Sequence, residues 1–125
     1  MERNTQQRRA ILKVLEETQR PLSVQEVLEL AQEDSPRLGI ATVYRNLKAL
    51  VAEEKLTAVD MPGNLVLYEM PRKEHHHHFT CTRCQRVFDV DACGFNFREL
   101  VPRGFRIQEH EIFLSGFCKS CASAR

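Results

Sequence analysis

Two Cys-x-x-Cys pairs constrain this chain more than any other feature. Cys81 and Cys84 form the first pair, and Cys118 and Cys121 form the second. Each such turn brings two sulfurs to one metal ion, and two turns complete the tetrahedral four-thiolate shell that is typical of structural zinc. A thioredoxin-like redox pair is the competing interpretation, but it requires one Cys-x-x-Cys in a βαβ pattern, which this sequence lacks. We therefore expect a closed zinc site that stabilises the fold and performs no chemistry.

The cysteines also indicate a compartment. Disulfides are rare in the cytosol, where clustered cysteines more often hold metal. The N-terminal stretch MERNTQQRRA lacks the apolar region of a signal peptide, and no apolar run approaches the roughly 20 residues of a membrane span. We expect a cytoplasmic protein that does not enter a membrane.

Metal-binding residue types are confined to the second part of the chain. All five His and all five Cys follow residue 74, after a polar, Pro-containing stretch at 71–74 that we interpret as a hinge. A chain of 125 residues makes one ordinary domain or two small ones. We predict an α+β protein with an N-terminal domain over 1–70 and a metal-binding domain over 75–125. The second domain is too small to rest on its core alone.

The first domain shows the order helix, helix, helix, hairpin. The predicted helices cover 5–17, a segment that opens at the capping box Ser23-Val24-Gln25-Glu26, and about 41–54. The predicted strands cover 56–60 and 65–68, around a Gly-containing turn. This order is that of a winged helix-turn-helix, although any small helical domain with a terminal hairpin also fits. In the second domain we predict strands over 87–90, 105–107 and 112–114 and a short helix over 97–101.

Four consecutive histidines, His75 to His78, precede the first cysteine pair. If this segment is a strand, its side chains alternate between two faces. His76 and His78 then form one pair and His75 and His77 the other, each spaced so that two imidazoles reach one metal. The residues that could complete these two sites are Glu69, Asp60 and Asp89 on one face, and Cys93 and His110 on the other. A solvated polar loop is the alternative, and Cys93 is nearly as typical of a small buried residue.

A zinc enzyme is the other class to consider. A catalytic zinc needs three protein ligands, a bound water and a general base. The sequence has no His-Glu-x-x-His and no His-x-Glu paired with Pro-Cys-x-x-Cys, and the chain is short for a substrate pocket. We therefore expect no enzymatic activity.

Two motifs together resemble the ferric uptake regulator (Fur) family of bacterial metalloregulators. They are GIATVYRNL, from Gly39 to Leu47, and HHHHFTCTRC, from His75 to Cys84. The similarity covers nearly the whole chain, from QRRAIL at 7–12 to the final Cys pair. It implies a homodimer of winged-helix domains, joined through C-terminal α+β domains, that binds a palindromic double-stranded DNA operator. It also implies a four-cysteine structural zinc and one or two regulatory metal sites in each chain.

The resemblance places Tyr44 and Arg45 at recognition-helix positions that meet DNA. A Tyr ring can pack on thymine methyls, and an Arg can bind guanine or phosphate. The net charge of residues 1–70 is −2, so DNA binding requires a local basic cluster. The implied DNA-binding residues are Arg8, Arg9, Lys13, Thr42, Tyr44, Arg45 and Lys48.

The resemblance also divides the metal ligands between two sites. The implied sensing site comprises Glu69, His76, His78 and Asp89, with Asp60 as an additional candidate, and the second site comprises His75, His77, Cys93 and His110. Pro21 stands where iron- and peroxide-sensing relatives have a His, so the sensing site has fewer ligands. That difference and the Cys93 thiolate favour zinc. Glu69 stands where zinc sensors often have a Cys, so iron or manganese, including peroxide sensing, is the alternative.

These expectations combine into a metal-dependent transcriptional repressor that controls metal homeostasis genes. Glu69 precedes the hinge, whereas His76 and His78 follow it. Metal bound by all three would fix the angle between the two domains, and the metal-bound dimer would place its recognition helices on the operator. A constitutive DNA-binding protein with purely structural metals is the rival interpretation.

Overall fold

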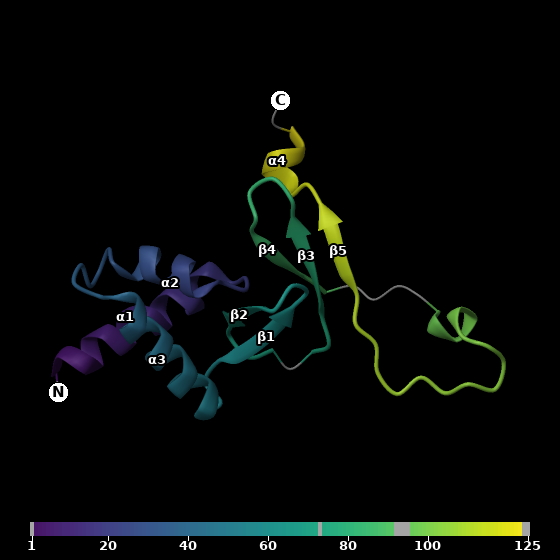
Figure 1. Cartoon of the computed structure of the whole chain (residues 1–125), viewed down its shortest axis with the longest axis horizontal. Coiled ribbons are helices and arrows are strands. Elements are labelled where there is room, and N and C mark those ends of the chain that lie inside the picture. Colours follow the sequence, from purple (N-terminus) through teal and green to yellow (C-terminus); the bar gives the residue numbers. More distant parts are fainter. Residues whose placement is uncertain (1, 73, 92–95, 124–125) are drawn as a thin grey trace. The chain divides into compact units, whose positions relative to one another are not determined.

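The computed structural model of the chain describes residues 2–72, 74–91 and 96–123 (Figure 1). The chain divides into two compact units, Met1–Lys73 and Glu74–Arg125. This division falls within the segment that we interpreted as a hinge. Among the described residues, no helix is long and apolar enough to cross a membrane.

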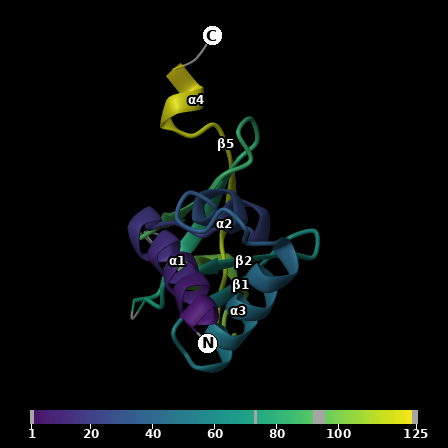
Figure 2. The ribbon, with the colours of Figure 1, turned by 90° about the vertical axis from the view of Figure 1, so that its left-hand side faces the viewer.

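Three helices open the first unit: α1 (Glu2–Thr18), α2 (Val24–Ala31) and α3 (Ile40–Ala52). Figure 2 looks onto them, with α1 and α3 side by side. The predicted capping box forms at the start of α2. The Glu26 backbone N–H donates to Ser23 Oγ at 3.1 Å, and the Ser23 N–H donates to a Glu26 carboxylate oxygen at 3.1 Å. All three helices were predicted from apolar spacing, and their bounds differ from the predicted ones by a few residues.

A β-hairpin completes the first unit. Strands β1 (Thr57–Met61) and β2 (Leu65–Glu69) pair antiparallel, with Thr57 opposite Glu69 and Met61 opposite Leu65. Gly63 in the turn has a φ of 85°, a left-handed conformation that Gly adopts without a steric penalty. Leu22 extends the hairpin, since it exchanges two backbone hydrogen bonds of 2.8 Å with Tyr68. The winged helix-turn-helix order is therefore confirmed.

The core of the first unit lies between the helices and the hairpin. Its members are the apolar positions that helical spacing assigned to the inner faces, joined by residues of the loops and of β2. The fully buried large side chains of this unit are Ile11, Leu15, Pro21, Leu22, Val27, Val43, Leu47 and Leu50. Burial of this stripe leaves Thr42, Tyr44, Arg45 and Lys48 on the outer side of α3, because residues of a helix repeat their face every three or four positions.

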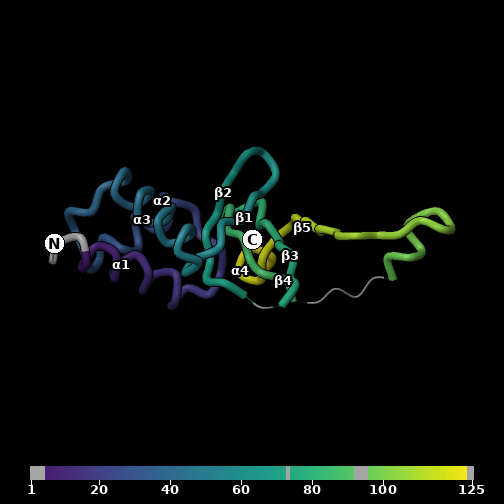
Figure 3. The backbone as a smooth tube through the Cα atoms, turned by 90° about the horizontal axis from the view of Figure 1, so that it is seen from below, coloured from purple at the N-terminus to yellow at the C-terminus, as the bar shows by residue number. Residues whose placement is uncertain are grey.

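The second unit is a three-stranded sheet in the order β4–β3–β5 (Figure 1). Strand β3 (His77–Cys81) pairs antiparallel with β4 (Val87–Val90) and parallel with β5 (Phe113–Gly116). A 3-10 helix, η1 (Phe97–Leu100), precedes β5, and a short helix, α4 (Lys119–Ser123), follows it. Figure 3 shows that the chain between η1 and β5 extends away from the sheet. The α+β class is confirmed.

One prediction for the second unit was wrong, and one helix was not predicted. Residues 105–107 are described and form no strand. Phe105 is 67% exposed, and no strand of the described ranges pairs with this segment. A strand requires a partner for its backbone N–H and C=O groups, and β-rich composition does not supply one. The helix α4 was not predicted, because five residues are too few for a helical period to be recognised in a sequence.

Candidate metal centres and nucleic-acid interface

The four cysteines of the two Cys-x-x-Cys pairs come together at one end of the sheet. Their sulfurs all lie within 4.8 Å of one another, and Cys84 Sγ is 3.9 Å from Cys118 Sγ. Cys81 ends β3, whereas Cys118 and Cys121 flank the start of α4. A set of four thiolates at this spacing suits a tetrahedral zinc ion and leaves no position for substrate. The cysteine cluster that the spacing predicted is thus formed.

Backbone contacts hold the two cysteine turns together. The Thr82 N–H donates to the Gly116 carbonyl at 2.8 Å, and the Thr82 hydroxyl donates to the same oxygen at 3.1 Å. Gly116 itself leaves room for a neighbour, since a Cβ there would lie 3.3 Å from the Phe79 ring. The parallel pairing of β3 with β5 therefore brings Cys81 beside the second pair, although the stretch 85–117 separates the two pairs in sequence.

The thiols of this cluster differ in acidity. Backbone N–H donors of Cys84 and Cys118 lower the pKa of Cys81 to about 6, because they stabilise a thiolate there. Burial and the neighbouring thiols raise the pKa of Cys121 to about 12. Adjacent thiolates repel one another, so without a cation only some of the four thiols can ionise. A divalent ion offsets this repulsion, since zinc binds thiolates and displaces their protons.

The first histidine pair, His76 and His78, lies on one face of the segment that enters β3. His78 lies opposite Asp89 of β4, and Nε2 of His78 is 3.4 Å from Oδ1 of Asp89. Nε2 of His76 lies 3.4 Å from the same oxygen, and the two imidazole centroids are 5.0 Å apart. Two imidazoles and a carboxylate converging in this way suit a first-row divalent metal.

The other face carries His75 and His77, as strand alternation predicted. Their Nε2 atoms are 2.9 Å apart, and Nε2 of His110 lies 3.0 Å from that of His75. His77 is buried, and its Nδ1 accepts a hydrogen bond of 3.1 Å from the backbone N–H of Ile112. Burial, helped by the nearby imidazoles of His75 and His110, lowers the pKa of His77 below its ordinary value. Three converging imidazoles form a ready set of nitrogen ligands for zinc.

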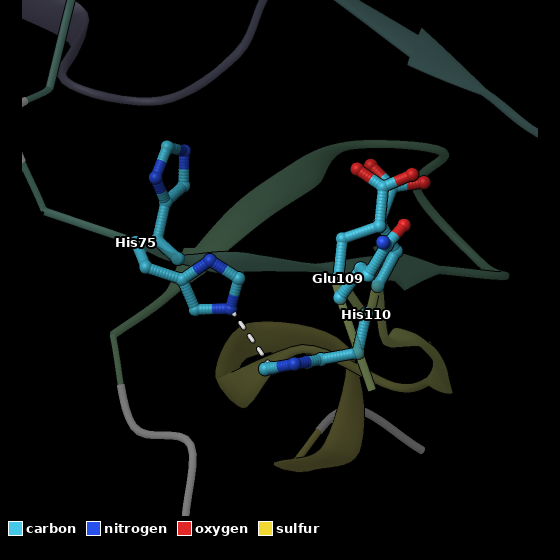
Figure 4. A pocket seen from close by; sticks show the side chains of 6 residues that line it. His75, Glu109 and His110 are labelled. Atoms are coloured by element: carbon cyan, nitrogen blue, oxygen red, sulfur yellow. Dashed lines mark hydrogen bonds between the residues drawn. The ribbon is translucent and has the colours of Figure 1, made fainter. Parts of the chain in front are cut away.

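A pocket of about 710 Å³ opens beside the three-histidine cluster. In Figure 4, His75 and His110 face one another across a 3.0 Å contact, whereas the Glu109 side chain extends away from them. Within the described residues the cluster contains three ligands. Cys93, the fourth ligand that we predicted, lies outside the described residues. Glu109 and Glu111 line the pocket and are further oxygen donors near it that sequence reasoning did not select.

The two carboxylates predicted from the hairpin differ in position. Glu69 lies opposite Thr57, and Asp60 lies opposite Val66. Because side chains alternate along a strand, Glu69 and Asp60 project from opposite faces of the hairpin. Asp60 is therefore poorly placed to bind the same metal ion as Glu69. Both residues belong to the first unit, and their role as ligands stays a prediction.

The predicted DNA-binding residues occupy α1 and the outer side of α3. Tyr44 is 45% exposed, and the Lys48 ammonium lies 5.1 Å from the centroid of its ring. Two of the α1 cations already have acidic partners: Arg8 forms a bidentate pair with Glu53, and Lys13 Nζ lies 2.9 Å from Asp34. No short pattern in the sequence predicts these pairs, because their members are far apart along the chain.

Sequence reasoning also missed a side chain that supports the three-histidine cluster. The Phe97 ring stacks on the His110 imidazole, with centroids 4.0 Å apart and an angle of 29° between the planes. Phe97 starts η1, where the sequence predicts only a short helix over 97–101. An aromatic residue near a ligand histidine in sequence is a weak signal that could have suggested this contact.

Comparisons with known proteins add independent findings. The family model described as the ferric uptake regulator family matches residues 2–115. A ferric uptake regulation protein of Bacillus subtilis is 32% identical over 125 residues, covering 94% of this chain and 83% of that protein. Another, from Cupriavidus metallidurans, is 32% identical over 114 residues and covers 86% and 80%.

Solved structures agree in fold. A zinc-bound manganese uptake regulator superimposes with a TM-score of 0.80 at 25% identity, covering 90% of this chain and 87% of that one. The ferric uptake regulator of Helicobacter pylori, described as having three functional metal binding sites, gives a TM-score of 0.70 at 25% identity and covers 94% and 81%. The zinc uptake regulator FurB of M. tuberculosis gives 0.53 at 27% identity, covering 95% of each chain.

Proposed function

We propose, from the premise that this chain belongs to the ferric uptake regulator family, that it represses transcription as a zinc-loaded homodimer. The family fixes the broader activity: the chain is a metal-dependent transcriptional regulator that binds DNA, and it is not an enzyme. The repressing direction, the metal, the operator and the ligand sets are the parts that we propose. A place in the cytoplasm, where the DNA is, belongs to the same proposal.

The observation that carries the proposal is the convergence of His76, His78 and Asp89 in the second unit, with the two histidines close behind the boundary between the units. Three donors can bind a divalent ion but leave its coordination shell incomplete. We propose that Glu69, which precedes the boundary, supplies the remaining ligand. A metal bound from both sides would restrict the motion of the DNA-binding unit, so metal affinity and DNA affinity would be coupled.

Zinc is the metal that we propose for this site. Two imidazoles and two carboxylates make a four-ligand set, which suits tetrahedral zinc. Pro21, which precedes α2, is buried and offers no side-chain donor, so this position supplies no fifth ligand. Iron or manganese is the second candidate. These two metals are favoured by the described cluster of His76, His78 and Asp89, because it contains nitrogen and oxygen donors and no sulfur.

Exposed apolar side chains in the second unit support a homodimer. Leu100 is 70% exposed, Phe105 is 67% exposed and Phe117 is 56% exposed. Large apolar side chains exposed to this extent suggest that another chain covers them. Strand β5 lies at the edge of the sheet, where its outer backbone groups can pair with another chain. We propose that a second copy covers this surface and that each dimer binds one palindromic operator.

Selection from a pool of random duplexes tests the proposal. Untagged protein that retains its four-cysteine zinc is incubated with the pool under a mild chelator, and with added zinc, manganese or iron(II) under anaerobic conditions. We expect enrichment of a palindrome only with zinc. His76→Ala should remove the dependence on added metal while leaving the structural zinc bound, and Glu74→Ala, a change at a neighbouring exposed residue, should behave as wild type.

Three outcomes contradict parts of the proposal. Equal DNA affinity with and without added metal would make every metal structural. Enrichment with iron or manganese alone would replace zinc as the regulator. A monomer at the protein concentration that binds DNA, measured by sedimentation, would exclude the dimer.

A further inference from the structure

A polar pocket of about 350 Å³ lies between α1 and α3 in the first unit. Its lining combines two guanidinium groups, two hydroxyls and an amide, and contains no carboxylate. The lining residues are Thr5, Arg8, Thr42, Arg45 and Asn46. Figure 2 shows the two helices that contribute them side by side. Arginine and hydroxyl donors gathered in this way are the groups that bind phosphate oxygens.

One guanidinium of this pocket, that of Arg8, already pairs with a carboxylate of the same chain. Nη1 and Nη2 of Arg8 donate to the two carboxylate oxygens of Glu53, at 2.9 and 2.6 Å. Glu53 follows the last residue of α3, and its side chain is not part of the pocket lining. The Glu53 carboxylate thus presents to Arg8 the same fork of two oxygens that a phosphate presents.

We propose that the α1–α3 pocket binds one backbone phosphate of DNA and that Glu53 is an intramolecular competitor that Arg8 exchanges for this phosphate. This inference rests on the proposed function, because it describes how the DNA-binding unit meets its partner. Thr5, Thr42 and Asn46 complete the phosphate site beside the two arginines. Glu53 thus limits DNA affinity by occupying Arg8, and not only by its negative charge.

The exchange is favourable because the pair is exposed. The Arg8 and Glu53 side chains are 32% and 44% exposed, so water and salt weaken their attraction. A phosphate in a duplex adds the release of condensed counterions, which favours its contact with a cation. Glu53 also keeps a second neighbour, since Lys55 Nζ lies 3.8 Å from its Oε1. Departure of Arg8 therefore leaves the carboxylate beside a cation.

The competitor has a functional consequence. Residues 1–70 carry a net charge of −2, and pairing of Arg8 with Glu53 keeps their surface weakly attractive to DNA in general. Lys13, which pairs with Asp34, is restrained in the same way. The competitor lowers affinity for every duplex, because every duplex presents backbone phosphates, and only an operator compensates for the loss by adding base contacts.

A set of four variants tests the exchange: Glu53→Gln, Arg8→Gln, the double variant, and Glu54→Gln as a matched loss of one acidic residue at the adjacent exposed position. Binding to a short duplex of arbitrary sequence is measured by fluorescence anisotropy over a series of salt concentrations. We expect Glu53→Gln to raise affinity roughly threefold or more at low salt, the effect of one phosphate contact. Arg8→Gln should lower affinity and reduce the salt slope by about 0.9 for each bound subunit.

The double variant decides the mechanism. If Glu53 acts on Arg8, the double variant binds as Arg8→Gln does, and the gain from Glu53→Gln disappears. The proposal is overturned if Glu53→Gln lowers affinity, since Glu53 would then orient Arg8 productively. It is also overturned if the gain equals that of Glu54→Gln or persists without Arg8, since a general charge effect would explain it. Thermal unfolding followed by circular dichroism confirms that the variants are folded.

Different results would reject the Arg8–Glu53 exchange and the metal-dependent repressor. Binding to arbitrary duplex under a chelator requires neither an operator nor a sensing metal. Coupling between Arg8 and Glu53 without any metal-dependent palindrome would retain the phosphate site and reject the zinc repressor. Metal-dependent operator binding without this coupling would retain the metal-dependent repressor and reject the exchange of Glu53 for a phosphate.

Discussion

Asp89 Oδ1 lies 3.4 Å from Nε2 of His78, the residue directly opposite it on the β3–β4 ladder. Nε2 of His76 lies at the same distance from the same oxygen. Asp89 is thus the common contact of two imidazoles that come from one face of a strand. A metal ion bound there would require all three groups, so Asp89 is the most informative position to change.

We expect Asp89→Asn to weaken zinc binding at the sensing site at least roughly tenfold, because the variant keeps the shape but loses the anionic oxygen. Competition with a chromophoric chelator measures this affinity in protein whose four-cysteine site is filled. Asp91→Asn, at an exposed residue beyond β4, is the matched control and should keep the wild-type affinity. Equal affinities for the two variants would remove Asp89 from the site.

Phe97 is expected to position His110 in the three-histidine cluster. Phe97→Leu keeps an apolar side chain but removes the ring that stacks on the imidazole at 4.0 Å. Stacked aromatic pairs contribute about 0.5–1.5 kcal/mol, so affinity for a metal at this cluster should fall roughly two- to tenfold. Isothermal titration of the second metal equivalent measures the change. Leu30→Ala, at a residue of the first unit that is 40% exposed, should have no effect, and an equal loss in both variants would refute the positioning role.

Removal of the four-cysteine zinc should unfold the second unit and leave the first folded. The first unit has its own core of buried helix and hairpin residues, whereas the second buries few large side chains. Small units of this kind obtain much of their folding free energy from metal binding. Cys118→Ser should therefore lose one zinc per chain and any dimer, while helical circular dichroism from α1 to α3 persists. Retention of the dimer without this zinc would contradict the expectation.

The stability of the second unit should depend on the charge of His77. Burial lowers the pKa of His77 in the folded chain below its ordinary value of 6.5. The unfolded chain therefore takes up a proton at a higher pH than the folded chain does, so the stabilisation is complete above about pH 6.5 and is lost as the pH falls through the lowered pKa. Urea midpoints on either side of this value measure the loss. His77→Gln cannot titrate and should show a smaller dependence on pH, with the cysteine site filled in both proteins; an equal dependence would exclude His77 as the cause.

Local patterns in the sequence were sufficient for much of the fold. Helical spacing placed α1 to α3, and Ser23 with Glu26 marked the start of α2, because these signals act over one or two turns. The alternation of a strand separated His76 and His78 from His75 and His77, although β3 itself begins only at His77. Each Cys-x-x-Cys likewise specifies a turn by itself. In all these cases the residues that carry the signal are also those that make the contact.

Contacts between distant residues were decided by the tertiary structure. The register of β3 with β4 set Asp89 against His78, and the return of the chain along β5 brought His110 to His75 and both cysteine pairs to one place. The pairing of Arg8 with Glu53 depends on how α1 crosses α3. The sequence by itself determined which side chains could bind metal or DNA, since that is a matter of chemical type and short spacing. Only the folded chain decided which of them meet, because strand register and helix packing are properties of many residues together and no short segment encodes them.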